Sequence, residues 1–252
     1  MRVLIFLGGT HMYHIKNLQT YFSKTELLLW LSSITLILLS FFLFDRENYL
    51  TLLASVIGVT SLIFNAKGNP IGQFLMVLFS LLYGIISFSF SYYGEMITYL
   101  GMTMPMAIFS LISWLKNPYE GNRSEVRVNH LTRNELLWMG IAAFFVTVLF
   151  FFLLTGFHTA NLLPSTLSVT TSFLAVYLTF RRSPYFALAY AANDILLILL
   201  WSLASISDSR YLAVVVCFLA FLCNDLYGFF CWREMKNRQS AGITSTPQTA
   251  LM

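Results

Sequence analysis

The chain has 252 residues, of which 58% are hydrophobic and only 10% are charged. A soluble globular domain carries about 25% charged residues, so this composition excludes a soluble fold and indicates a protein of the lipid bilayer. The net charge of +4 does not indicate a nucleic-acid partner, because the basic residues stand in short segments between apolar runs and form no single patch.

Eight apolar segments of the chain are long enough to be candidate membrane spans. A helix needs about 20 apolar residues to cross roughly 30 Å of hydrocarbon. Only a helix or a closed barrel satisfies its backbone hydrogen bonds there, so we predict an all-α integral membrane protein. In chain order the predicted spans are 26–44, 50–66, 70–90, 95–115, 134–156, 162–180, 184–204 and 210–232.

Three segments lie outside the predicted spans and are longer than a tight turn. Residues 1–25 are expected to form a cytoplasmic N-terminal segment, and residues 116–133 a cytoplasmic loop. Residues 233–252 are expected to form a disordered cytoplasmic tail, because the stretch from 239 onward is polar and contains few apolar residues. The transporting or binding part of the chain is therefore expected within residues 26–232.

The basic residues divide unequally between the two sides of the predicted membrane. With eight spans and a cytoplasmic N-terminus, only Arg46 and Arg210 face the outside, and the other 13 of the 15 Lys and Arg residues face the cytoplasm. Cytoplasmic loops carry such an excess, so we predict a multi-pass plasma-membrane protein with both termini in the cytoplasm. The 13 residues are Arg2, Lys16, Lys24, Lys67, Lys116, Arg123, Arg127, Arg133, Arg181, Arg182, Arg233, Lys236 and Arg238.

The two halves of the chain, approximately 26–115 and 134–232, share short matches in the same order. Each half holds an even number of spans, so both have the same orientation. This pattern predicts a parallel repeat, related by an axis along the membrane normal. The matching pairs are ELLLW at 26–30 with ELLW at 135–138, KGNP at 67–70 with RRSP at 181–184, Tyr93 with Tyr211, and Trp114 with Trp232.

Polar side chains at membrane depth are the candidates for a binding site, because each is costly to insert unless it faces the protein interior. Two Asn-Asp pairs stand in the seventh and eighth spans, and spans three, four, six, seven and eight are expected to line a small polar cavity with aromatic walls. The Asn-Asp pairs could instead hold helices together. The predicted binding residues are Asn193, Asp194, Asn224, Asp225, Tyr227, Gln73, Tyr83, Tyr190 and Trp201.

Two further aromatic residues, Trp114 and Trp232, stand at the ends of predicted spans and are expected to anchor them at the membrane interface. The sequence contains no Gly-rich phosphate loop, zinc-binding helix motif or nucleophile elbow. Its three cysteines lack Cys-x-x-Cys spacing. We therefore expect neither an enzyme nor a bound metal or cofactor.

The stretch from Asn65 to Trp114, together with NDILLILLW at 193–201 and NDLYGFFCW at 224–232, resembles the PnuC-type transporters, best known for nicotinamide riboside. The likeness covers roughly residues 26–235. It implies two parallel three-helix bundles, spans two to four and six to eight, joined by span five as a linker helix, with span one as an extra N-terminal helix. It also implies uptake by facilitated diffusion, with trapping of the product by a cytoplasmic kinase.

The resemblance leaves the substrate open. Nicotinamide riboside members typically carry Trp-x-x-Trp before the Asn of the seventh span, and this chain has Phe186 and Ala189 at those positions. Deoxynucleosides, thiamine and riboflavin remain alternative substrates, and a non-transporting receptor or assembly protein remains an alternative of another class. We expect a small-molecule substrate and the lipid bilayer as partners and no nucleic acid. Association into a homo-oligomer and proton coupling stay open.

Overall fold

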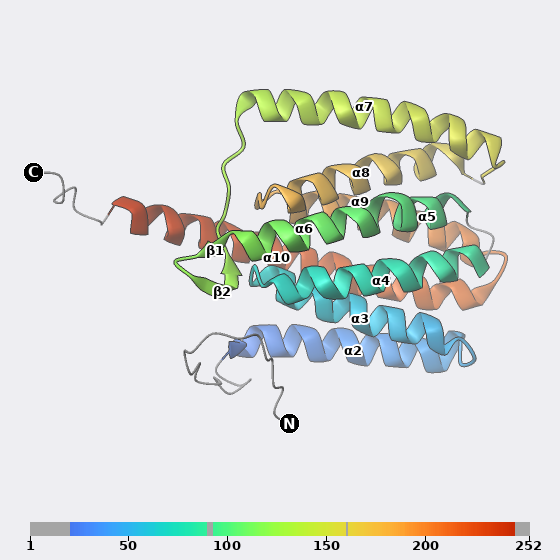
Figure 1. The fold of residues 1–252 in the computed structure, drawn as a ribbon. Coiled ribbons are helices and arrows are strands. Elements are labelled where there is room, and N and C mark those ends of the chain that lie inside the picture. Colours follow the sequence, from blue (N-terminus) through green and yellow to red (C-terminus); the bar gives the residue numbers. More distant parts are fainter. Residues whose placement is uncertain (1–20, 90–92, 160, 245–252) are drawn as a thin grey trace, which may run out of the picture.

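Eight helices long and apolar enough to cross a membrane lie side by side in one bundle in the computed structural model, which describes residues 21–89, 93–159 and 161–244 (Figure 1). The predicted all-α membrane fold is confirmed. Most of the predicted N-terminal segment lies outside the described residues. The elements are α2 Lys24–Phe44, α3 Tyr49–Ala66, α4 Pro70–Ser89, α5 Tyr93–Thr98, the π-helical turn η1 Tyr99–Thr103, α6 Met104–Lys116, β1 Pro118–Tyr119, β2 Asn122–Val126, α7 Arg133–Gly156, α8 Leu162–Phe180, α9 Phe186–Ser205, the 3₁₀ turn η2 Ser209–Tyr211 and α10 Leu212–Thr244.

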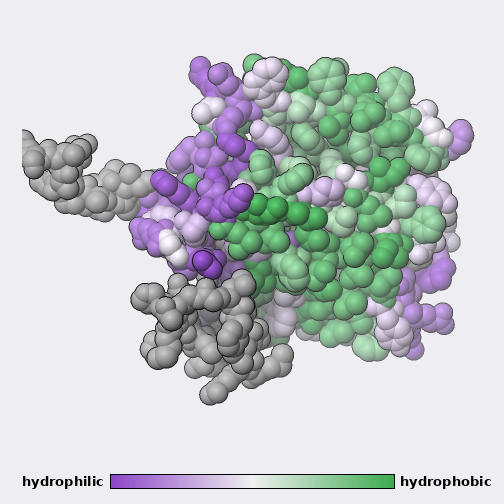
Figure 2. All heavy atoms as spheres, in the orientation of Figure 1, coloured by the Kyte–Doolittle hydropathy of each residue, from purple (hydrophilic) through white to green (hydrophobic). Residues whose placement is uncertain are grey.

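The surface of the bundle is apolar around its middle and polar at its two ends, as Figure 2 shows. Helix α7 contributes much of this apolar surface. Its side chains Trp138, Phe145 and Phe152 are 66%, 66% and 67% exposed. Such a continuous apolar surface is stable when it faces hydrocarbon, so this apolar surface marks the part of the protein that lies in the membrane.

The helices form two three-helix bundles. Helices α3, α4 and α5–α6 form the first, and α8, α9 and α10 form the second. The bundles meet where α3 packs on α10 and where α6 packs on α8, which are equivalent contacts if the halves are related by a two-fold axis. Helix α7 links the bundles and packs on α8, whereas α2 packs on α3 and α10. This is the architecture that the resemblance implies.

The repeat is visible in two ion pairs at equivalent places. Glu26 closes a capping box at the start of α2, and Lys67, just after α3, places its Nζ 3.1 Å from the Glu26 carboxylate. Glu135 closes a capping box at the start of α7, and Arg181, just after α8, pairs with its carboxylate. A capping box satisfies two backbone N–H groups of the first turn, and it places an acidic residue at the positive end of the helix. Helices α2 and α7 therefore occupy equivalent positions in the sequence repeat.

The indole rings of Trp114 and Trp232 lie inside the protein, and the predicted role as interface anchors is wrong. Trp114 is 1% exposed and donates from Nε1 to the Thr179 carbonyl at 3.0 Å, and Trp232 is 0% exposed and donates to the Asn65 carbonyl at 2.7 Å. The two ring centroids are 5.4 Å apart. Each ring thus bonds a helix end of the opposite bundle. Position at a span end does not reveal whether a side chain faces lipid or the other half.

The segment after α6 crosses from one bundle to the other. Strands β1 and β2 form an antiparallel hairpin. The Val126 N–H donates to the Gly68 carbonyl at 2.9 Å, and the Asn129 N–H donates to the Arg182 carbonyl at 3.0 Å. Gly68 and Arg182 follow the equivalent helices α3 and α8, and both have positive φ, 64° and 56°. The segment therefore holds the same turn in both bundles. We call this end of the bundle the hairpin end, and the opposite end the far end.

Helix α10 extends through the segment predicted to be a disordered tail, so that prediction is wrong for residues 233–244. Gln239 is 4% exposed, accepts from the Val128 N–H at 2.8 Å and donates to Glu125 at 2.9 Å. These contacts with the hairpin and the residues just after it give the polar side chain of Gln239 buried partners, which the composition of the tail does not reveal. Residues 245–252 lie outside the described part of the chain.

Alanine at Gly72 should destabilise the first bundle. A Cβ at this position would lie 2.7 Å from the Asn65 backbone nitrogen and 2.2 Å from its Oδ1, so the backbone of α3 would have to move. We expect a loss of about 1–3 kcal/mol, measured as a lower midpoint of thermal unfolding in detergent. Gly140→Ala is the matched control, because its Cβ would meet nothing within 4 Å. Equal midpoints for the two variants would contradict the tight packing of α3 on α4.

Candidate functional site

A cavity of about 20 Å³ lies between the two bundles. It is smaller than a nucleoside, so the bundles are closed around it in this structure. Both bundles contribute its walls, which combine polar groups and aromatic rings. The described residues that line it are Leu62, Met76, Phe79, Tyr99, Thr103, Ser172, Tyr190, Asn193, Asp194, Phe218, Phe221 and Asp225. We call it the central cavity.

Asn193 is held in one orientation by two hydroxyl groups of α8. Thr171 and Ser172 each donate to its Oδ1 at 3.0 Å. Because Oδ1 takes both of these contacts, the NH2 group is turned away from the two hydroxyls. Asn193 is 3% exposed and lines the central cavity. Its amide can therefore donate to an acceptor that enters there.

Asp194 and Asp225 bring two carboxyl groups together across α9 and α10. They are 3% and 4% exposed, and their side chains lie within hydrogen-bonding contact of each other. The pair can accept hydrogen bonds from ligand hydroxyls, and its negative charge favours a cationic ligand.

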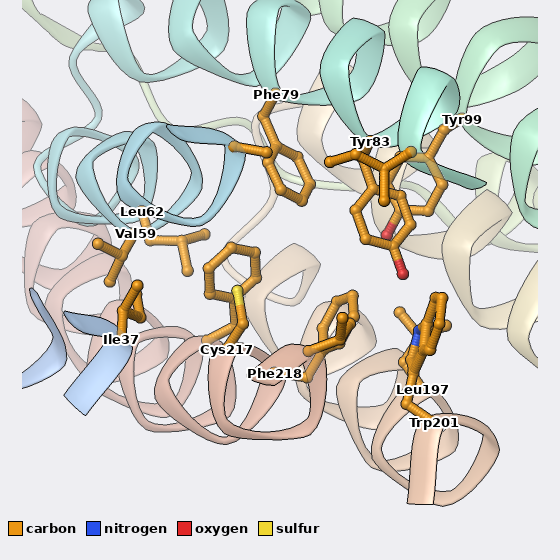
Figure 3. Close-up of a cluster of buried hydrophobic side chains, with 14 of the residues drawn as sticks. Ile37, Val59, Leu62, Phe79, Tyr83, Tyr99, Leu197, Trp201, Cys217 and Phe218 are labelled. Atoms are coloured by element: carbon orange, nitrogen blue, oxygen red, sulfur yellow. The ribbon is translucent and has the colours of Figure 1, made fainter. Parts of the chain in front are cut away.

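An aromatic cluster continues from the central cavity toward the far end (Figure 3). The Tyr83 ring lies 4.4 Å from that of Tyr99 and 6.3 Å from that of Trp201, between centroids. Tyr99 belongs to the π-helical turn η1, and it lines the cavity together with Thr103 of the same turn. Single π-helical turns occur frequently at functional sites. The turn changes which side chains of the fourth span face inward.

Six of the nine predicted residues gather in this region. Four of them, Tyr190, Asn193, Asp194 and Asp225, line the central cavity itself. The other two, Tyr83 and Trp201, belong to the adjoining aromatic cluster, and the Tyr83 hydroxyl points toward the Trp201 indole (Figure 3).

The other three predicted residues face elsewhere. Gln73 is buried but donates to Oδ1 of Asn65 at 2.8 Å, within the first bundle. Asn224 donates to Oγ of Ser33 in α2 at 3.0 Å. Tyr227, one helical turn after Asn224, is half-buried on that same side of α10. Since Asn224 and Asp225 are neighbours, their side chains point about 100° apart, and only Asp225 faces the cavity.

Phe186 and Ala189, which replace the Trp-x-x-Trp of nicotinamide riboside members, lie on the side of the central cavity nearer the hairpin end. The Phe186 ring is 4.9 Å from that of Trp232 and 6.2 Å from that of Tyr190. Phe186 therefore fills the space between the buried Trp pair and the cavity wall, and Ala189 adds no aromatic surface there.

Sequence reasoning missed Glu95, an acidic residue in the first turn of α5. It lines a second cavity of about 220 Å³ at the far end, which we call the outer cavity. A carboxylate inside a predicted span was the available signal, but Glu95 stands at the first residue of that span, where charged side chains are common. Tyr99 and Thr103 gave no signal, because the π-helical turn is not visible in the sequence.

Comparisons with known proteins agree with this architecture. The model of the nicotinamide mononucleotide transporter family matches residues 48–234. The nicotinamide riboside transporter PnuC of Neisseria mucosa is 28% identical over 229 residues, which cover 88% of this chain and 84% of that protein. The crystal structure of the vitamin B3 transporter PnuC superposes with a TM-score of 0.76 at 23% identity, over 86% of this chain and 94% of that one.

Proposed function

Since the chain belongs to the nicotinamide mononucleotide transporter family, we propose that it carries nicotinamide riboside, or a related nucleoside or vitamin, across the membrane. The observation that carries the proposal is the central cavity between the two bundles, where the amide of Asn193 and the carboxyl pair of Asp194 and Asp225 meet aromatic walls. Asn193 would bind the carboxamide or a ribose hydroxyl, the carboxyl groups would accept hydrogen bonds from ribose, and the rings would stack on the base.

The charges around both cavities favour a riboside over a mononucleotide. Among the described residues that line them there is no Lys or Arg, whereas Glu95, Asp194 and Asp225 are acidic. A phosphate needs cationic or N–H partners, and carboxylates repel it. The nicotinamide ring of the riboside carries a positive charge, which suits both the carboxylates and the aromatic faces.

The transport cycle that we propose needs no energy source within this chain. The central cavity is closed, so admission of the substrate requires the two bundles to move apart at one end and then at the other. The sequence lacks a Walker motif. We propose facilitated diffusion toward the cytoplasm, followed by trapping through a cytoplasmic kinase, with the hairpin end and both termini on the cytoplasmic side.

Uptake into proteoliposomes that contain the purified protein tests this function. We expect labelled nicotinamide riboside to enter faster than into empty liposomes and to stop at equal concentrations inside and outside, with or without a pH gradient. Accumulation above that level under a pH gradient would contradict facilitated diffusion. Absence of uptake would contradict the function itself. Saturable binding without uptake would instead support the receptor alternative. Competition by thiamine, riboflavin or thymidine identifies the preferred substrate.

A further inference from the structure

The outer cavity at the far end of the bundle is larger than the central one and is separate from it. It is lined by parts of α5, α7, α8 and α9 and has a volume of about 220 Å³. The described residues that line it are Gly94, Glu95, Leu154, Thr159, Asn161, Ser165, Val169, Leu200, Trp201, Leu203, Ala204 and Ser207. Most of these are apolar or neutral, so Glu95 dominates the charge of the cavity.

The Glu95 carboxylate has little to compensate its charge. The Ser168 hydroxyl lies 3.5 Å from its Oε1, which is at the limit of a hydrogen bond. None of the ion pairs among the described residues involves it. The two Arg residues of the far end bond elsewhere: Arg46 donates to the Phe42 carbonyl and Arg210 pairs with Asp208. A carboxylate so placed in a cavity favours a cationic ligand.

Trp201 forms part of the wall of the outer cavity and also joins it to the central site. Its ring packs at 6.3 Å from that of Tyr83, which in turn packs at 4.4 Å from that of Tyr99 in the central cavity wall (Figure 3). The face of an indole attracts cations more strongly than that of any other side chain. A carboxylate and an indole on one cavity form a pair suited to a flat aromatic cation.

We infer that Glu95 and Trp201 form an outer subsite, distinct from the central cavity, that holds the positively charged ring of the substrate on the far side of the protein before it passes inward. The inference rests on the proposed function, because it takes the riboside as substrate. It also accounts for a carboxylate that the central site does not use. The aromatic cluster of Trp201, Tyr83 and Tyr99 then lies between the two sites as the path for the ring.

Glu95→Gln tests this subsite, because the amide keeps the size of the side chain and one acceptor oxygen but carries no charge. Uptake is measured for nicotinamide riboside and for its reduced dihydro form, which has nearly the same shape but a neutral ring. We expect KM for the cation to rise about tenfold and KM for the neutral form to stay unchanged. Glu47→Gln, at an exposed carboxylate of the same end, should change neither.

Two results would overturn the subsite. One is an unchanged KM for the cation in Glu95→Gln. The other is an equal rise in KM for both forms, which would indicate a structural role for Glu95. If the wild-type protein transports neither form, the proposed function is wrong. The outer subsite is then tested separately, by ligand binding to the purified protein. The N-methylnicotinamide cation should raise the unfolding midpoint of the wild type more than neutral nicotinamide does, and Glu95→Gln should abolish that difference; equal midpoints in the wild type would overturn it.

Discussion

Replacing Asn193 by Ala should raise the KM for uptake of nicotinamide riboside about 10- to 100-fold. The side chain is fixed by Thr171 and Ser172, so its NH2 group is available to the substrate without reorientation. Removal loses that hydrogen bond and also leaves the buried Ser172 hydroxyl without its acceptor, and each such loss costs about 1–3 kcal/mol. Initial rates of uptake over a range of concentrations measure the effect.

Asn224→Ala is the matched control for this prediction. Asn224 is as buried as Asn193 and is likewise followed by Asp, but it bonds Ser33 of α2 and not the cavity. We expect lower thermal stability in this variant with KM unchanged. An Asn193→Ala variant with wild-type KM, or an equal loss in both variants, would remove Asn193 from the binding site.

Alanine at Trp232 should remove much of the stability of the protein. The indole is 0% exposed, packs against the rings of Trp114 and Phe186, and bonds the Asn65 carbonyl of the other bundle. Truncation of a buried Trp costs about 3–5 kcal/mol, out of a typical total of about 5–15 kcal/mol. We expect a large fall in the unfolding midpoint in detergent and a lower yield of monodisperse protein.

Trp138→Ala controls for the loss of an aromatic ring as such. Trp138 is 66% exposed on α7 and stands on the apolar surface. Its truncation should leave the unfolding midpoint close to that of the wild type. If Trp232→Ala unfolds no earlier than Trp138→Ala, then the two buried indoles do not hold the bundles together.

Much of the fold could be predicted from the sequence because the membrane restricts the choices. A segment of this chain that crosses the hydrocarbon must be a helix of about 20 apolar residues, so the positions of the apolar runs predict the positions of the spans. Glu26 and Glu135, which match in the sequence, both close capping boxes and both pair with a basic residue just after the following helix. Burial of Trp114 and Trp232 could not be predicted, because it depends on how one half of the chain packs on the other.

The candidate site was predictable only in part, because helical periodicity defines faces but not their partners. Helical geometry puts Asn224 and Tyr227 on one face of α10 and Asp225 on another, yet nothing in the sequence says which face meets α9 and which meets α2. Gln73 is polar and buried because it bonds Asn65 within its own bundle, not because it meets a ligand. The extension of α10 depends likewise on Gln239 bonding the hairpin segment.

We propose that the substrate binds between the two bundles beside Asn193. A structure of the protein with nicotinamide riboside bound tests it most directly. We predict ligand between α9, α10 and the η1 turn, with a polar atom within hydrogen-bonding distance of the Asn193 amide and the two bundles further apart than here. Ligand bound on the other side of α10, beside Asn224 and Ser33, would contradict the account, as would a saturated protein with an empty central site.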